Sequence, residues 1–405
     1  MNGPSGAAPQ SRQSQPTYAL DGHSPTGDWL AVASVALMCF VLVLTEFLPI
    51  GLLPAIASGL HVSLGTAGLV VVAPGLTAAL TAPLLTIASG RLDRRKVLIT
   101  LALLTASSNA LAACAPNITV MLIARVALGA GVGGFWTMGA GVAARLVPPC
   151  AVHRATSVIT GGISSGTVVS LPLGALVGQT AGWRTAFVVA AGAALVALAA
   201  LLLRLPALPP VGALRLAELT ATFRKHGPRV ALLGSALIFL GHFAAYTYLT
   251  PYLEQLARFG SSAVTATLLV YGVAGLAGNF AAGAIIGRSL RAVYVTATVL
   301  VAAAAILLSP LAGAAPAVVV LVVAWGAAFG AVPLALQTWI LRVSPEKPES
   351  GMALLVSTSQ IALAAGSLAG GLVVDGYGIR VGFTFGAALA LLSVIPHLRR
   401  LPDVG

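Results

Sequence analysis

The chain has 405 residues, of which 58% are apolar and only 8% are charged, and its formal net charge is +12. A soluble globular domain carries roughly 25% charged residues, so this composition excludes an ordinary water-soluble enzyme, and the high hydrophobicity excludes a disordered chain. The three cysteines contain no C-x-x-C pair and build no disulfide framework. The composition therefore predicts an integral membrane protein.

The chain begins with a polar stretch and continues as a series of apolar segments. Residues 1–28 are rich in Gly, Pro, Ser and Gln, which predicts a disordered tail rather than a signal peptide. Each later segment is long enough to cross the ~30 Å hydrocarbon core as a helix. We expect an all-α protein with twelve transmembrane helices at 29–52, 66–88, 97–115, 119–142, 156–180, 185–203, 229–252, 263–286, 292–311, 316–341, 351–374 and 379–397.

The segments divide into two groups of six. Residues 204–228, a linker with three prolines and a basic run, separate an N-terminal half at 29–203 from a C-terminal half at 229–397, and 398–405 form a short tail. Residues 174–187 match residues 370–383 at six of fourteen positions. This repeat predicts two six-helix pseudo-repeats with a binding site between them and alternating access.

The basic residues are distributed unequally between the two sides of the membrane. If the N-terminus is cytoplasmic, 18 of the 22 Lys and Arg residues lie in inside segments, and only Arg184, Arg258 and Arg380 lie outside. The positive-inside rule then predicts that both termini, the linker and the two tails are cytoplasmic. The positive charge faces the anionic inner leaflet, so we expect the lipid bilayer as a partner and no nucleic acid.

One acidic residue, Glu46, and one basic residue, Arg125, lie deep inside apolar segments. Each stands six residues from the expected outer end of its helix, which places both about 9 Å below the outer surface at ~1.5 Å per residue. A lone charge at bilayer depth costs about 2.5–3.5 kcal/mol, so such residues pair or line a cavity. We interpret Glu46 as a proton carrier that Arg125 tunes. A purely structural ion pair is the alternative.

A stripe of small residues at every fourth position of segment 156–180 is typical of close helix packing. It consists of Gly162, Gly166, Ser170, Gly174 and Gly178, with Pro172 inside it as a predicted kink. Similar stripes occur in segments 263–286 and 351–374. They favour either sliding contacts between the halves or static packing.

A basic stretch with one acid, G-R-L-D-R-R-K at 90–96, joins the second and third segments. Asp93 falls at the start of a helix, where the helix dipole favours a carboxylate, and the neighbouring arginines can pair with it. We predict a cytoplasmic latch formed by Gly90, Asp93, Arg94 and Arg95. A simple topology signal is the alternative.

Polar and aromatic residues inside the segments are the candidates for a substrate cavity. They are Phe47, Asn109, Trp136, His242, Tyr246, Tyr271, Asn279 and Gln360. His242 either titrates during transport or is a hydrogen-bonded packing residue. The sequence contains no metal-ligand cluster, phosphate loop or nucleophile–base pair, so we expect no metal, no cofactor and no enzyme activity.

Together these motifs resemble the major facilitator superfamily, in its twelve-helix drug/proton antiporter branch, over residues 29–397. The 90–96 stretch resembles the superfamily's loop 2–3 signature, and Arg125-Val-Ala-Leu-Gly129 resembles its helix-4 motif. The stretch with Pro172, Leu173 and Gly174 resembles its antiporter motif, with Leu171 in place of the usual Gly before the proline. The runs T-E-F at 45–47, G-N-F at 278–280 and 241–251 resemble a bacterial subgroup of sugar and phenicol exporters. The resemblance implies the fold of that superfamily and a role for Arg125 in proton coupling.

The leading hypothesis is a multi-pass, proton-coupled efflux antiporter of the bacterial inner membrane. It would export a small amphipathic molecule, such as a drug or a sugar-like metabolite, with the proton gradient as its energy source and no cofactor. The resemblance implies a monomer. One alternative is a uniporter or importer in which Glu46 and Arg125 are only structural. A remote alternative is a membrane sensor or scaffold that transports nothing.

Overall fold

The computed structural model describes residues 28–88, 92–209 and 216–398, and every regular element in these ranges is a helix. The helices of the N-terminal half are α1 (Trp29–Leu60), α2 (Leu64–Ala88), α3 (Arg94–Ala113), α4 (Ile118–Leu146), η1 (Pro149–Ala151), α5 (Val152–Thr180) and α6 (Trp183–Arg204). After α7 (Leu216–Arg224), the C-terminal half contains α8 (His226–Tyr246), α9 (Leu249–Pro251), η2 (Tyr252–Leu256), α10 (Ser261–Ile285), α11 (Leu290–Leu308), α12 (Ala315–Val343), α13 (Pro348–Tyr377), α14 (Ile379–Leu392) and α15 (Ile395–Leu398). The predicted tail at 1–28 lies outside the described residues except for Asp28, whose carboxylate caps α1.

Eleven helices of the described ranges are long and apolar enough to cross a membrane. The twelfth predicted segment, 379–397, is shorter than expected, because α14 ends at Leu392 and a turn separates it from α15. Proline has no backbone N–H, so Pro396 cannot donate to the carbonyl of Leu392 four residues earlier. The proline therefore accounts for the break.

Among the other helices, the first and the seventh differ most from their predicted bounds. The first runs eight residues past the expected end at position 52 and stops at Leu60, where His61 adopts a left-handed conformation with φ 55. Pro49 and Pro54 lie inside it, as the membrane permits where neighbours satisfy the freed carbonyls. The seventh predicted segment breaks after Tyr246 and ends in the π-helix η2, since Pro251 cannot donate to the carbonyl of Thr247.

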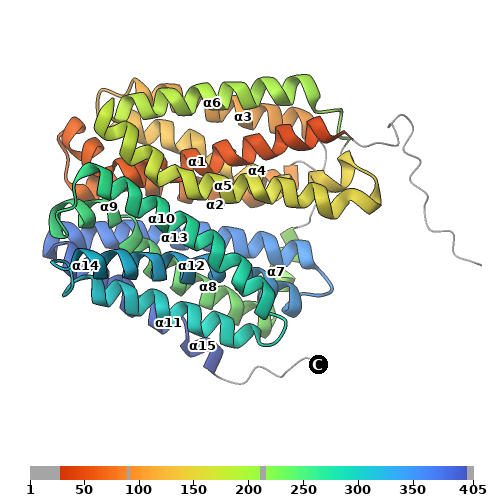
Figure 1. The fold of residues 1–405 in the computed structure, drawn as a ribbon. Coiled ribbons are helices and arrows are strands. Elements are labelled where there is room, and N and C mark those ends of the chain that lie inside the picture. Colours follow the sequence, from red (N-terminus) through yellow and green to blue (C-terminus); the bar gives the residue numbers. More distant parts are fainter. Residues whose placement is uncertain (1–27, 89–91, 210–215, 399–405) are drawn as a thin grey trace, which may run out of the picture.

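The helices pack in pairs that recur along the chain. In the N-terminal half α1 packs on α5, α2 on α4, and α3 on α6; in the C-terminal half α8 packs on α13, α10 on α12, and α11 on α14. The contacts between the halves are made chiefly by α2 with α13 and by α5 with α10. Figure 1 accordingly shows these four helices between α3 and α6 on one side and α11 and α14 on the other.

The linker between the halves contains a short helix of its own, α7. Its Glu218 carboxylate accepts from Lys347 Nζ at 2.9 Å, and Lys225 Nζ donates to Glu346 at 2.7 Å. The hydrogen bond from Lys225 also lowers the pKa of the exposed Glu346 carboxyl. These contacts attach the described end of the linker to the C-terminal half.

The predicted stripe of small residues is a packing surface within one half. A Cβ atom on Gly162, Gly166 or Gly174 would meet a backbone carbonyl of α1, at Ala36, Phe40 or Leu48. The stripe in α13 meets α8 in the same way, through Gly366 and Gly370. The expectation of sliding contacts between the halves is therefore wrong for these stripes, because each joins two helices of the same half.

The seam between α10 and α12 predicts a stability effect. A Cβ atom on Gly330 would overlap the carbonyl of Gly275, whereas a Cβ atom on Gly192 of α6 would meet nothing within 4 Å. We expect Gly330→Ala to lower the free energy of unfolding by about 1–3 kcal/mol, because overpacking forces the helices apart. Thermal unfolding in detergent measures this, with Gly192→Ala as the matched control. Equal midpoints for the two variants would contradict the packing of this seam.

Candidate functional site

Arg125 is fully buried in α4 and binds backbone carbonyls rather than a carboxylate. Its Nε donates to the carbonyl of Val70 at 2.9 Å, Nη1 to that of Thr45 at 3.0 Å, and Nη2 to that of Glu46 at 3.0 Å. Neither oxygen of the Glu46 carboxyl accepts a hydrogen bond from this guanidinium in the described chain. The Arg125 guanidinium thus binds the backbone carbonyl of Glu46, and the two side chains form no ion pair in the described chain.

Two prolines explain why these carbonyls need Arg125. In a regular helix the carbonyl of residue i accepts from the N–H of residue i+4. Pro49 stands four residues after Thr45 and Pro74 stands four residues after Val70, and neither has an N–H to donate. Arg125 supplies both missing donors and so joins α1, α2 and α4. The positions of the two prolines in the sequence already indicate which carbonyls lack a donor. The prediction that Arg125 pairs with Glu46 did not use those positions.

Glu46 lies near the middle of α1, with 3% of its surface exposed. At ~1.5 Å per residue it is about 21 Å from Leu60 along the helix, which is farther from the helix end than the predicted helix end at position 52 implied, because α1 continues to Leu60. Its Oε1 accepts from Gln360 Nε2 of α13 at 3.0 Å. Its Oε2 has no hydrogen-bond partner among the described residues, although the Trp136 indole lies near enough to interact with the carboxyl.

A cluster of aromatic rings surrounds His242 in the C-terminal half. The histidine ring stacks on Phe329 at 3.3 Å and on Tyr246 at 4.8 Å, and Tyr246 stacks on Tyr271 at 5.0 Å. We call His242, Phe243, Tyr246, Tyr271, Trp325 and Phe329 the aromatic cluster. Phe47 of α1 stacks on Phe243 at 6.0 Å, which connects the cluster to the residue after Glu46.

His242 is held as a neutral ring. Trp325 Nε1 lies 3.1 Å from His242 Nδ1, and an indole N–H can only donate. Nδ1 therefore accepts, the proton of the imidazole is on Nε2, and a second proton would break the bond to Trp325. His242 Nε2 and the Tyr271 hydroxyl have no partner among the described residues. This geometry favours the packing interpretation of His242 over titration.

The structure brings together six of the eight predicted cavity residues in two groups. Phe47, His242, Tyr246 and Tyr271 belong to or contact the aromatic cluster, and Trp136 and Gln360 lie at the Glu46 carboxyl. Asn109 instead binds Thr45 and the carbonyl of Thr105, and Asn279 binds the carbonyl of Gly330 in the α10–α12 seam. Sequence reasoning missed Trp325 and Phe329, although their four-residue spacing places both on one face of a helix.

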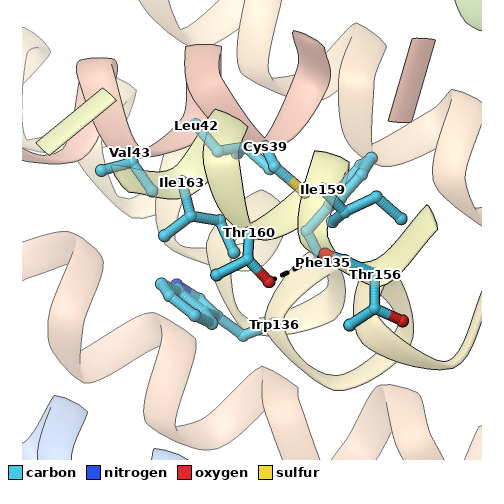
Figure 2. Close-up of a pocket in the computed structure, with 9 residues that line it drawn as sticks. All are labelled: Cys39, Leu42, Val43, Phe135, Trp136, Thr156, Ile159, Thr160 and Ile163. Carbon is cyan, nitrogen blue, oxygen red and sulfur yellow. Dashed lines mark hydrogen bonds between the residues drawn. The ribbon is translucent and has the colours of Figure 1, made fainter. Parts of the chain in front are cut away.

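A small pocket opens beside Trp136 in the N-terminal half. Its volume is about 80 Å³, and Figure 2 shows its lining from α1, α4 and α5: Cys39, Leu42, Val43, Phe135, Trp136, Thr156, Ile159, Thr160 and Ile163. Drug-sized ligands occupy pockets of about 300–1,000 Å³, so this pocket is too small to hold one by itself. Trp136 connects it to Glu46.

The predicted latch residues bind the end of their own half. Asp93 Oδ1 accepts from the N–H groups of Arg95 and Leu208, at 2.8 Å and 3.0 Å, and Arg95 Nη2 donates to the carbonyl of Leu202 at 3.0 Å. Gly90 lies outside the described residues. In the described part of the chain these hydrogen bonds fasten α3 to the segment after α6, so a latch between the halves stays a prediction.

A contact between the halves does occur at the opposite ends of the helices. Asp375 of α13 accepts from the Gly65 N–H at 2.8 Å and from the Ser63 hydroxyl at 2.5 Å. Close by, the Tyr248 hydroxyl donates to the carbonyl of Ser367 at 3.0 Å. The start of α2 is therefore fastened to the end of α13, and this end of the interface is closed.

Removing the Asp375 carboxylate is expected to loosen this closed end. Two exposed hydrogen bonds to a carboxylate contribute about 1 kcal/mol, or about a fivefold shift in the ratio of closed to open molecules. In a Ser367→Cys background, Asp375→Ala should therefore raise the rate of maleimide labelling by about that factor. Glu346→Ala, an acid at the other end of the molecule, is the control. Equal labelling in both variants would show that Asp375 does not hold the ends together.

Comparison with known proteins places the chain in a family. The model of the Major Facilitator Superfamily matches residues 35–348 and 270–404. The Transcription regulatory protein OpdE of Pseudomonas aeruginosa is 36% identical over 387 residues, covering 93% of this chain and 96% of that protein. The Purine ribonucleoside efflux pump NepI of Escherichia coli K12 is 32% identical over 368 residues, covering 91% of this chain and 93% of that protein.

A solved structure supports the same fold. The human organic anion transporter MFSD10 (TETRAN) superposes with a TM-score of 0.65 and 21% identity, covering 91% of this chain and 98% of that one. The family match and the two bacterial relatives together cover nearly all of the described helices. The chain belongs to the major facilitator superfamily and is a multi-pass membrane transporter, not an enzyme.

Proposed function

We propose that the protein is a proton-coupled antiporter of the bacterial inner membrane that exports a small, uncharged or weakly charged molecule. The observation that carries this proposal is the Glu46 carboxyl, which is buried where the halves meet and keeps one oxygen without a partner among the described residues. An ion pair holds a buried carboxyl in its charged form, whereas a carboxyl without such a pair is free to take up a proton.

Alternating access follows from the arrangement of the helices. The recurring pairs α1–α5 and α8–α13, α2–α4 and α10–α12, and α3–α6 and α11–α14 support two six-helix pseudo-repeats. The basic residues support cytoplasmic termini. In that orientation the contact of Asp375 closes the outer end, and the pocket of Figure 2 lies toward the cytoplasm. The state is then inward-facing, ready to load a substrate for export.

The aromatic cluster supports a substrate with a flat apolar surface and a few hydrogen-bonding groups. Aromatic rings stack on flat apolar surfaces, and His242 Nε2 and the Tyr271 hydroxyl are buried polar atoms without a partner among the described residues. A nucleoside has this chemistry, and the Escherichia coli relative is named as a purine ribonucleoside efflux pump. Phenicol drugs share part of this chemistry. A sugar without a ring system to stack fits the cluster less well.

Each of two competing functions is supported by one observation. Arg125 binds three carbonyls and joins three helices, which suits a uniporter or importer in which this region is structural. The name of the Pseudomonas relative supports a regulatory role as the other alternative. Both competitors predict that no substrate moves protons.

The experiment uses inside-out vesicles with a dye that reports the proton gradient. Nucleosides, phenicols, aromatic cations and pentoses are added in turn to vesicles that contain the protein and to vesicles that lack it. We expect one class, nucleosides first, to collapse the gradient only where the protein is present. Radiolabelled flux without proton movement would support the uniporter. Absence of flux for every compound would support the regulatory function.

A further inference from the structure

A side-chain hydrogen bond between Glu46 and Gln360 joins the two halves in the apolar part of the helices. Gln360 Nε2 donates to Glu46 Oε1 at 3.0 Å, and the two residues are 3% and 8% exposed. The second oxygen of each group, Glu46 Oε2 and Gln360 Oε1, has no hydrogen-bond partner among the described residues. Two acceptors are thus left over on the same pair.

A single proton satisfies both leftover atoms. A carboxylic acid has one O–H donor and one C=O acceptor, and a primary amide has an N–H donor and a C=O acceptor, so the two groups are complementary. With Oε1 already bound to Nε2, an O–H on Glu46 Oε2 can donate to Gln360 Oε1. Without that proton, Glu46 Oε2 and Gln360 Oε1 are both acceptors without a hydrogen-bond partner among the described residues, and a buried acceptor without a partner is costly.

The backbone places Gln360 within reach of the other half. A Cβ atom on Gly75 of α2 would lie 3.1 Å from the carbonyl of Gln360 and 3.1 Å from the Cβ of Ala364. Because glycine has no such atom, α13 lies directly on α2 at this level, and the Gln360 side chain extends to α1. The pair can therefore form only while α13 stays on α2.

The other titratable groups around the pair do not replace this contact. In the described residues, α4 brings Arg125, which is committed to three carbonyls, and α8 brings His242, which accepts from Trp325. Tyrosines and cysteines aside, α2 and α9 have no titratable side chain. The titratable residues of α3, α5, α6 and α13 lie in the terminal turns of those helices. The proton on Glu46 is thus the variable part of the contact.

We propose that Gln360 is a positioning residue that senses the proton on Glu46. The protonated carboxyl and the amide form a clasp of two hydrogen bonds between α1 and α13, which holds the halves in this arrangement. Loss of the proton leaves one bond and two opposed acceptors, and α13 is released. This inference rests on the proposed function of Glu46, and it gives Gln360 a coupling role in place of the predicted substrate contact.

The test measures the release of α13 without any substrate. Leu363, which is buried against Gly75, is replaced by Cys in a chain whose Cys39 and Cys150 are Ser. The rate of N-ethylmaleimide labelling at position 363 is measured between about pH 6 and pH 8. It is divided by the rate at the exposed Cys114, which corrects for the change of thiol reactivity with pH. The full chain is reconstituted in liposomes, with Gln337→Met as control for Gln360→Met, because Gln337 is exposed on α12.

The expected relative rate rises with pH in the parent and in Gln337→Met. It should be high and independent of pH in Gln360→Met, and low and independent of pH in Glu46→Gln, where an amide pair imitates the protonated clasp. The exchanged variant, Glu46→Gln with Gln360→Glu, should regain pH dependence because an acid–amide pair is restored. If Gln360→Met fails to fold, the pH dependence of the exchanged variant alone tests the role of Gln360.

The outcomes separate the two proposals. Parental pH dependence in Gln360→Met, or none in the exchanged variant, would overturn the role of Gln360 while leaving Glu46 as the proton carrier. Parental pH dependence in Glu46→Gln would overturn both, because the titrating group would then lie elsewhere.

Discussion

Replacing Glu46 with Gln is expected to reduce transport driven by a pH gradient to the level of liposomes without protein. The amide keeps the size of the side chain and a hydrogen bond to Gln360, so folding and insertion should be unaffected. It cannot bind or release a proton, so no free energy from the gradient reaches the substrate. Any downhill flux of substrate that remains should no longer depend on pH.

Glu346→Gln is the matched control for this prediction. Glu346 is an exposed acid outside the membrane that pairs with Lys225, and such exposed pairs contribute little to stability. The control should transport as the parent does. Gradient-driven transport in Glu46→Gln at the level of this control would show that the proton uses another group.

Replacing Arg125 with Lys is expected to destabilise the protein rather than to change its pH dependence alone. A lysine ammonium cannot reach three carbonyls on two helices in the planar geometry of a guanidinium. The carbonyls of Val70, Thr45 and Glu46 would lose charged donors, and each such hydrogen bond is worth about 1.5–3 kcal/mol. We expect a loss of about 2–5 kcal/mol, measured by thermal unfolding in detergent.

A second substitution tests the cause of that loss. Pro49→Ala restores the N–H that can bond to the Thr45 carbonyl within α1, so adding it to Arg125→Lys should recover part of the stability. Arg342→Lys, an exchange at an exposed position, should have no effect. An unchanged midpoint for Arg125→Lys, or no recovery with Pro49→Ala, would contradict the role of Arg125 as a donor to proline-freed carbonyls.

The positions of most long helices could be predicted from the sequence. Apolar runs of about 20 residues located the eleven helices of the described ranges that are long enough to cross a membrane, because length and hydrophobicity alone decide what can cross a bilayer. Glu46 and Arg125 were identified because charges are rare at that depth. The ends of α1, α8 and α14 were less predictable, since a proline can either break a helix, as at Pro396, or be tolerated, as at Pro49. Tertiary neighbours make that difference.

The partners of the site residues were beyond prediction from one sequence. Glu46 and Gln360 are 314 positions apart, and only the packing of α13 on α2 brings them together. Arg125 was expected to tune or pair with a carboxylate, and the structure gives it backbone carbonyls instead. The stripe in α5 was recognised as a packing surface, but its spacing could not tell which helix, α1 or one from the other half, lies against it.

The most direct test of proton coupling is the movement of protons driven by substrate alone. Proteoliposomes with a pH dye inside are prepared without a pH gradient, and the exported compound identified in vesicles is placed on one side only. The account predicts that protons move against the direction of the substrate in the parent and not in Glu46→Gln. Substrate movement with no change in internal pH in the parent would contradict antiport and leave a uniporter.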